Sequence, residues 1–113
     1  MHVPLITDKM WDKIYEAAAS PMLLVLFECG RKGAELRLKV EEVADEYDDR
    51  AIFLAINIDE NPSFASVTMP TGESWRVEGA AIILVKGKVV IGRLPPHASR
   101  EEIGQLVEAG LGR

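Results

Sequence analysis

The hydrophobic side chains of this chain gather in short uninterrupted runs, separated by stretches in which apolar residues recur with helical spacing. An apolar run without alternation is typical of a strand covered on both faces, as in the centre of an α/β sheet. The run at 51–58 has seven apolar side chains out of eight and is followed directly by Asp59, Glu60, Asn61 and Pro62. We therefore predict a buried central strand here, and we expect any functional site to lie near its end.

The other apolar runs predict three further strands, at 22–27, 80–85 and 88–91. The last two runs are separated only by Lys86 and Gly87, which is the pattern of a tight antiparallel hairpin. We therefore expect the C-terminal part of the sheet to be a β-hairpin.

Three segments have apolar residues at helical spacing and predict helices. The first runs from about residue 9 to residue 19 after a cap at Asp8. We expect the apolar face of this helix to be buried, with Met10, Trp11, Ile14, Tyr15 and Ala18 on it. The second helix is predicted at 34–47. The third follows Ser99 and Glu102, whose spacing is that of a capping box.

The segment 61–79 has the least regular pattern. Phe64, Ala65 and Val67 predict the start of a short helix, which Pro70 should break. The predicted order is then α, β, α, β, an irregular segment, β, β and α. A chain of 113 residues has room for one core, so we predict a single domain over residues 1–113.

Composition argues against several classes of function. The net charge is -5 and the cations are scattered, which argues against nucleic-acid binding. No apolar run approaches the roughly 20 residues of a membrane span, and residues 1–6 lack a signal-peptide pattern, so we expect no membrane association and a cytoplasmic location. The chain has one cysteine, Cys29, and its two histidines, His2 and His97, are far apart. We therefore expect no internal disulfide, no metal site and no bound cofactor.

The order of elements and several short motifs resemble the thioredoxin family. Residues 56–62, Ile-Asn-Ile-Asp-Glu-Asn-Pro, look like the family's strand-end motif, and residues 24–27 look like its Val-Asp-Phe strand. Residues 40–47 are similar to the second half of its active-site helix, and residues 86–90 to its hairpin turn. The resemblance implies a thioredoxin-like three-layer α/β/α fold, with a central mixed sheet built from a βαβ unit and a C-terminal β-hairpin and flanked by helices.

The resemblance also implies that catalytic parts of the family are missing. Thioredoxins carry Trp-Cys-Gly-Pro-Cys where residues 28–33 read Glu-Cys-Gly-Arg-Lys-Gly, without a second cysteine. The family's buried Asp falls on Leu26, and the Lys that partners it falls on Ala55. A dithiol oxidoreductase needs a second thiol to resolve its mixed disulfide with substrate. Ordinary disulfide reductase activity is therefore not expected.

The family's cis-proline has no clear counterpart. In the family this proline stands at the start of the strand that corresponds to residues 80–85. The resemblance therefore places its position on Ala80 or Ala81. Met69-Pro70-Thr71 also resembles the family's Ile-Pro-Thr, but Gly72 to Gly79 then separate it from the strand that should follow directly. We favour an insertion before the strand.

Cys29 has two interpretations. As a small apolar residue at the end of a strand, it would be buried and inert. As a residue at or near the N-terminus of the helix at 34–47, beside Arg31 and Lys32, it would have the electropositive setting that lowers a thiol pKa, although Glu28 acts in the opposite direction. Such a thiol forms mixed disulfides with glutathione or a partner, or is oxidised to sulfenic acid. A disulfide between the Cys29 residues of two chains would give a homodimer.

Trp75 and Arg76 also have two interpretations. The segment that holds them would lie near the face on which thioredoxins bind substrates, and Trp and Arg are enriched at binding hot spots. The alternative is that Trp75 folds back against its own domain while Arg76 is solvated.

Two functions follow as hypotheses. The first is a thioredoxin-like module without dithiol activity that binds unknown protein partners, as a scaffold or a chaperone-like protein. Its contact surface would consist of residues from two loops, namely Gly30, Arg31, Lys32, Gly33, Trp75, Arg76, Ala80 and Ala81. The alternative is a monothiol protein of cell redox homeostasis, in which Cys29 is the catalytic residue.

Overall fold

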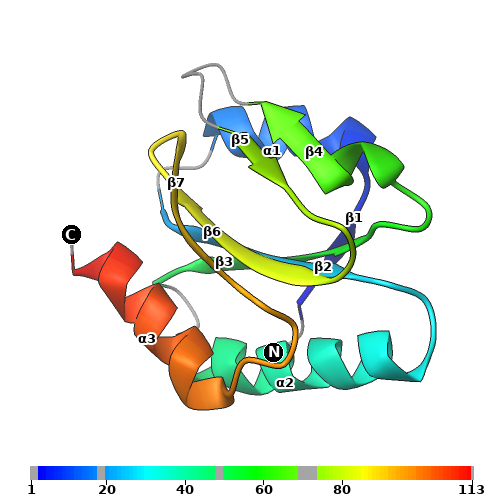
Figure 1. Cartoon of the computed structure of the whole chain (residues 1–113). Coiled ribbons are helices and arrows are strands. Elements are labelled where there is room, and N and C mark those ends of the chain that lie inside the picture. The colour runs from blue at the N-terminus through cyan, green and yellow to red at the C-terminus, as the bar shows by residue number, and fades with distance from the viewer. Residues whose placement is uncertain (1–2, 18–19, 48–49, 69–73, 113) are drawn as a thin grey trace.

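The computed structural model describes residues 3–17, 20–47, 50–68 and 74–112. A five-stranded mixed sheet lies at its centre, with the strand order β1-β3-β2-β6-β7. Helices α2 and α3 cover one face of this sheet, and helix α1 with the small β4–β5 sheet covers the other (Figure 1). The three-layer arrangement predicted from the sequence is therefore confirmed.

Two parallel strands at the centre of the sheet bring the candidate site together. The six side chains of β2 (Met22–Phe27) are all buried, as the continuous apolar run predicts. Strand β3 (Ile52–Asn57) pairs with β2 in parallel, from Met22 opposite Ile52 to Phe27 opposite Asn57. Since both strands end at the same edge of the sheet, the segments that follow them meet there.

The predicted hairpin consists of β6 (Ala81–Lys86) and β7 (Val89–Leu94). Gly87 and Lys88 both have positive φ, at 59° and 68°. This is the conformation of a type I′ turn, whose twist matches that of the flanking strands. The turn therefore lies one residue later than predicted. On the opposite side of the sheet, β1 (Leu5–Ile6) is an additional edge strand that the sequence did not indicate, since it has only two residues.

The three predicted helices are present, and two of them start earlier than predicted. Helix α1 (Asp8–Ala17) includes Asp8 as its first residue, so the prediction that Asp8 precedes the helix is wrong. Helix α2 (Arg31–Tyr47) begins at Arg31 rather than at residue 34. Helix α3 (Arg100–Leu111) has the predicted capping box, in which Ser99 and Glu102 bond to each other's backbone N–H.

One side chain that the sequence predicted on a buried helix face is exposed in the structure. Trp11 and Tyr15 of α1 are buried, but Met10 is 45% exposed. The apolar stripe of this helix is therefore narrower than its sequence suggests. Ala18, predicted on the same face, lies outside the described residues.

The segment predicted to be irregular contains regular structure. A 3-10 helix (Pro62–Ala65) is followed by β4 (Ser66–Thr68), and β5 (Ser74–Arg76) pairs with β4 in antiparallel orientation. The expected short helix is therefore right as far as Ala65 and wrong at Val67, which lies in β4. Residues 69–73, including the candidate Pro70, lie outside the described residues.

Candidate functional site

Cys29 lies in the short connection between β2 and α2, at the edge where β2 and β3 end. Its side chain is exposed, so the expectation that Cys29 is buried, which belonged to the first interpretation, is wrong. Gly30 follows with φ of +111°, a conformation that residues with a side chain rarely adopt. The Gly30 carbonyl accepts a hydrogen bond from Ala34 N at 3.1 Å, so Gly30 caps α2 and Cys29 directly precedes the cap.

Gly33 fixes the path of this connection. A Cβ atom at this position would lie 1.9 Å from the Glu28 carbonyl oxygen and 3.2 Å from Phe27 Cδ2. The first turn of α2 therefore packs against the backbone at the end of β2, at a distance that only glycine permits. Gly33 is buried and serves the fold, in contrast to its neighbours Arg31 and Lys32, which are exposed.

Two polar side chains, one from the last residue of β3 and one that follows the strand, hold Cys29. Asp59 Oδ2 accepts a hydrogen bond from Cys29 N at 2.8 Å, and Asn57 Nδ2 donates one to Cys29 Sγ at 3.2 Å. Asn57 Oδ1 in turn accepts a hydrogen bond from Asp59 N at 2.9 Å. The strand end thus positions both the backbone and the sulfur of Cys29.

Asn57 and Asn61 are the site residues whose roles the sequence did not reveal. Both are buried, at 8% and 7% exposure, and the Asn61 side chain donates to Asn57 O at 3.0 Å. Asn61 Oδ1 also accepts from Asp8 N at 3.2 Å, which ties the start of α1 to the same strand end. A buried amide needs hydrogen-bond partners. Asn57, as a polar residue within the apolar run at 51–58, was therefore the feature of the sequence that could have indicated this role.

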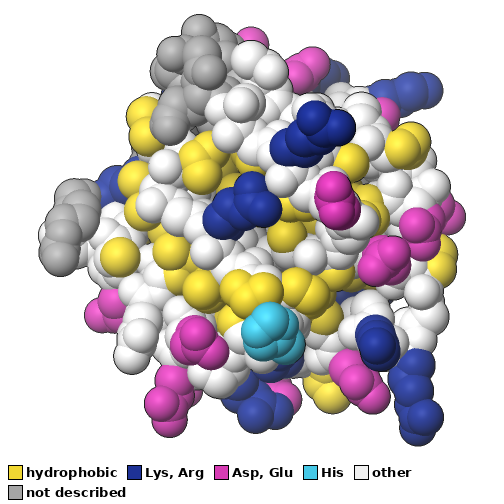
Figure 2. Space-filling view, in the orientation of Figure 1, with side chains coloured by type: hydrophobic (Ala, Val, Ile, Leu, Met, Phe, Trp, Pro, Cys, Tyr) yellow, Lys and Arg dark blue, Asp and Glu magenta, His cyan; other side chains and the backbone are white. Residues whose placement is uncertain are grey.

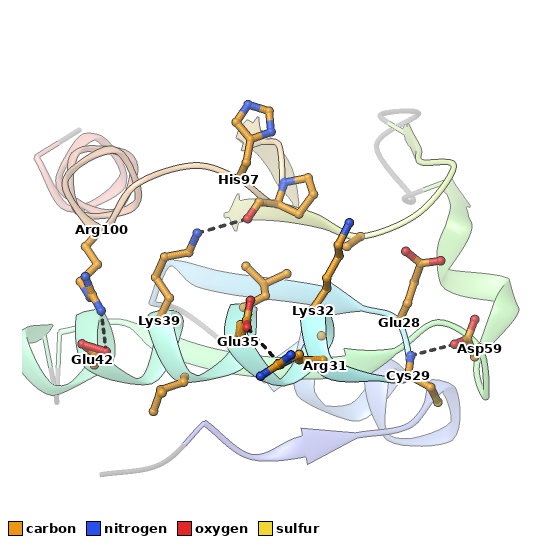
Figure 3. A pocket seen from close by; sticks show the side chains of 15 residues that line it. Glu28, Cys29, Arg31, Lys32, Glu35, Lys39, Glu42, Asp59, His97 and Arg100 are labelled. Carbon is orange, nitrogen blue, oxygen red and sulfur yellow. Dashed lines mark hydrogen bonds and ion pairs between the residues drawn. The ribbon is translucent and has the colours of Figure 1, made fainter.

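A groove of about 1040 Å³ runs from Cys29 along α2 to the start of α3 (Figure 3). Its walls are α2 and the connection between β7 and α3, which holds Pro96 and His97. Lys39 Nζ donates to Pro96 O at 3.2 Å, and Arg100 forms an ion pair with Glu42 at 2.8 Å. These two contacts join the walls across the groove and fix their separation.

Some of the residues predicted as a contact surface line the groove, and others do not. Arg31, Lys32 and Gly33 line it together with Cys29 and Ala80. Gly30 lies beside it in the same connection, and Ala80 directly precedes β6. Ala81 is the first residue of β6 and is buried at 4% exposure.

Trp75 and Arg76 do not line the groove. The Trp75 ring is 3% exposed, and its Nε1–H donates to Phe64 O at 2.8 Å. Its ring lies edge-on to Trp11, with centroids 6.2 Å apart. The structure therefore places Trp75 as in the second interpretation, folded back against its own domain, while Arg76 is exposed.

The two positions onto which the resemblance to thioredoxins places a buried Asp and its partner Lys are apolar in this protein. Leu26 and Ala55 are both fully buried, at 0% exposure. A carboxylate at the end of β2 that could relay a proton to a thiol is thus replaced by a side chain without ionisable atoms. Elsewhere, Lys and Arg lie among Asp and Glu on the face shown in Figure 2, without a large cluster of one sign.

Hydrogen bonds perturb two groups at the start of α3. The N–H of Ser99 donates to Glu102, which lowers the pKa of that carboxyl, and the nearby His97 and Lys39 contribute in the same direction. The hydrogen bond and charge of Glu42 raise the pKa of the Arg100 guanidinium. Both effects indicate that this wall of the groove is held by charged contacts.

Within the described ranges, no helix is long and apolar enough to cross a membrane. The described side chains also contain no group of three or more His, Cys, Asp or Glu placed to hold a metal ion.

Comparison with known proteins supports the fold and does not assign a family. No protein-family model matches the chain, and no curated protein matches it. A solved structure of chloroplastic thioredoxin z is similar, with a TM-score of 0.72, 21% sequence identity, and coverage of 96% of this chain and 93% of that chain. At this identity the likeness shows the fold alone: the chain has a thioredoxin-like fold.

Proposed function

We propose that this protein is a thioredoxin-like module that binds a protein partner through the groove beside Cys29 and does not catalyse dithiol–disulfide exchange. The observation that carries the proposal is the single cysteine in a chain with a thioredoxin-like fold. An attacking thiolate without a second thiol stays attached to its substrate. The apolar Leu26 and Ala55 are consistent with this proposal, because they leave no buried ionisable pair for proton transfer.

The binding role is supported by the construction of the groove. It is open to solvent, and contacts between α2 and the β7–α3 side hold its walls before any partner arrives. A preformed site loses less conformational entropy on binding than a flexible one. Chloroplastic thioredoxin z, which shares the fold, has a crystal structure that is described in terms of target recognition. We also retain the cytoplasmic location as a proposal, which subcellular fractionation would test.

Reduction of insulin disulfides tests the redox half of the proposal. With dithiothreitol as the electron donor, we expect the purified protein to leave the rate of insulin precipitation at that of dithiothreitol alone. A thioredoxin serves as the positive control in the same assay. Catalysis at a thioredoxin-like rate, abolished by Cys29→Ser, would overturn the proposal.

A monothiol redox protein is the second candidate, because the Cys29 thiol is exposed and its sulfur accepts a hydrogen bond from Asn57. The Cys29 thiolate would attack glutathione disulfide, forming a Cys29–glutathione disulfide and releasing one glutathione thiolate. A second glutathione thiol would then attack the adduct, restore the Cys29 thiolate and leave as glutathione disulfide. Mass spectrometry after exposure to glutathione disulfide would show the adduct, and Cys29→Ser would remove it.

Because the Cys29 thiol is exposed, a third candidate is a homodimer in which a disulfide joins the Cys29 residues of two chains. Oxidation of the concentrated protein followed by non-reducing electrophoresis would reveal it. Cys29→Ser gives the matched control, because it removes the sulfur with little change in side-chain size.

A further inference from the structure

A tyrosine hydroxyl is buried without a described partner in the layer opposite the groove. The Tyr15 side chain is 7% exposed, and its ring packs against Trp11 with the ring centroids 5.3 Å apart. Among the residues that the structure describes, none forms a hydrogen bond with the buried Tyr15 oxygen. A buried hydroxyl without a partner has lost its bonds to water and gained none in exchange. This hydroxyl therefore opposes the packing of α1 against the sheet.

Tyr47 is the matched case in which the hydroxyl is paired. It is the last residue of α2 and is buried to a similar degree as Tyr15. Its hydroxyl donates a hydrogen bond to Gly104 O at 3.2 Å, which joins the end of α2 to α3. The two tyrosines therefore differ in the one interaction that a phenol can make and a phenyl ring cannot.

The described hydrogen bonds that join α1 to other elements lie at its first residue. Asp8 N donates to Asn61 Oδ1 at 3.2 Å, and the Asp8 carboxylate accepts from Ser63 Oγ at 3.3 Å. Further along α1, the described attachment is the packing of Trp11 and Tyr15, whereas α2 buries six residues. A helix of ten residues is also too short to be stable in water without such packing. The first residue of α1 is thus held firmly and its second half weakly.

We propose that α1 opens as a separate unit, with Asp8 at its fixed end and Tyr15 at its releasing end, while the sheet, α2 and α3 stay folded. On opening, the Tyr15 hydroxyl bonds to water, and this gain offsets part of the cost of exposing Trp11. Together with the β4–β5 sheet, α1 covers one face of the central sheet (Figure 1). Its opening uncovers apolar side chains of β2 on that face, namely Leu24 and Leu26. This face is opposite the groove, so the opening does not depend on partner binding there.

Hydrogen exchange of the native protein, followed by NMR, tests this inference. The amide of Ile14 reports on α1, and the amide of Val25 reports on the central strand β2. We expect the protection factor of Ile14 to be lower than that of Val25 by about a hundredfold or more, because opening one element needs less free energy than unfolding the whole protein. Equal protection of the two amides would overturn the inference.

Tyr15→Phe tests the assigned role of the hydroxyl. The substitution removes the oxygen that has no described partner and keeps the ring that packs on Trp11. We expect the protection factor of Ile14 to rise about tenfold, because the closed state no longer contains an unpaired hydroxyl. An unchanged or lower protection factor would show that the hydroxyl does not favour opening, and would overturn the inference.

Tyr47→Phe is the matched control on α2. It leaves Gly104 O without its hydrogen bond and should lower the protection factor of Val25, whose exchange requires global unfolding. The protection factor of Ile14 should stay unchanged, because the surroundings of Tyr47 remain intact when α1 alone opens. A parallel decrease at both amides would show that α1 opens only when the whole protein unfolds, and would overturn the inference. None of these results bears on the insulin assay or on binding in the groove.

Discussion

Two segments that the sequence marks as contact surfaces have opposite environments in the structure. The Cys29–Gly33 connection lies at the surface, and polar side chains from the end of β3 hold it there. Trp75, in β5, is in the core of the opposite layer, where Trp11 and Phe64 surround it. The first segment is therefore available to a partner, and the second supports the fold.

The difference follows from the chemistry of the side chains. An indole has a large apolar area and one N–H, and both requirements are met when Trp75 packs on Trp11 and donates to Phe64 O. The Cys29 connection has small or charged side chains and little apolar area to bury. Its position depends on backbone contacts, namely the close approach at Gly33 and the hydrogen bond to Asp59.

The largest effect should come from removing the buried indole. We expect Trp75→Ala to lower the free energy of unfolding by about 3–5 kcal/mol, because it leaves a cavity and an unpaired carbonyl at Phe64. Urea denaturation would measure the change. Arg76→Ala is the control at the adjacent exposed position, where the effect should stay within about 0.5 kcal/mol. A change as small as this for Trp75→Ala would show that the indole is not part of the core.

Gly33 provides the corresponding test of the Cys29 connection. Replacing a helical glycine by alanine usually stabilises a helix by about 1 kcal/mol. At Gly33 the new Cβ would clash with the Glu28 carbonyl, so we expect destabilisation of about 1–3 kcal/mol instead.

Gly104→Ala is the matched control for this substitution. Gly104 is also helical, but its nearest contact is the Tyr47 hydroxyl at 3.3 Å, which can move. Gly104→Ala should therefore shift the midpoint of urea denaturation clearly less than Gly33→Ala does. If Gly33→Ala stabilised the protein as ordinary helix propensity predicts, the described path of the connection would be wrong.

The wall of the groove opposite α2 depends on the capping box of α3. Ser99→Ala removes the hydroxyl that accepts the Glu102 N–H at 3.1 Å and should cost about 1 kcal/mol. Thermal denaturation would measure this loss. Ser99→Asp retains a capping oxygen and should lose less stability than Ser99→Ala.

The same box gives the protein a defined response to acid. The folded state lowers the pKa of Glu102 below its ordinary value of 4.5, so the ionised carboxyl stabilises the fold. This contribution is fully present above pH 4.5 and is lost as the pH falls through the lowered pKa. The stability difference between the unmodified protein and Glu102→Gln should therefore shrink over this acidic range. A difference that grew with acidification would contradict the assigned direction.

The smallest expected effect concerns the hydrogen bond from Cys29 N to Asp59. Asp59→Asn keeps an acceptor oxygen but removes the charge, and we expect a loss of stability of about 0.5 kcal/mol. Hydrogen exchange followed by NMR should show faster exchange of the Cys29 amide. Glu60→Gln, at the next exposed position, should leave that amide unchanged.

Much of the fold could be predicted because long apolar runs and capping chemistry are local signals. The run at 22–27 became β2 with the predicted bounds, and Ser99 with Glu102 capped α3 as expected. The strands β1, β4 and β5 were missed because two or three residues are too short to show a period.

The site was harder to predict because it depends on contacts between distant residues. Asn57 and Cys29 are 28 positions apart, and only the parallel pairing of β2 and β3 brings them together. The β7–α3 connection forms the other wall of the groove, and no motif near Cys29 indicates this. Lys32 could be proposed from the sequence as a contact residue, but the contribution of Pro96 required the structure.

Partner binding by two single variants tests the central claim most directly. Proteins retained from a cell extract by the immobilised protein would be quantified for Cys29→Ser and for Lys32→Glu, with Lys13→Glu as the charge-matched control. The account predicts that Cys29→Ser and Lys13→Glu retain the same partners as the unmodified protein, while Lys32→Glu loses them. Loss of the partners with Cys29→Ser, together with their retention by Lys32→Glu, would contradict binding through the groove and favour thiol chemistry at Cys29.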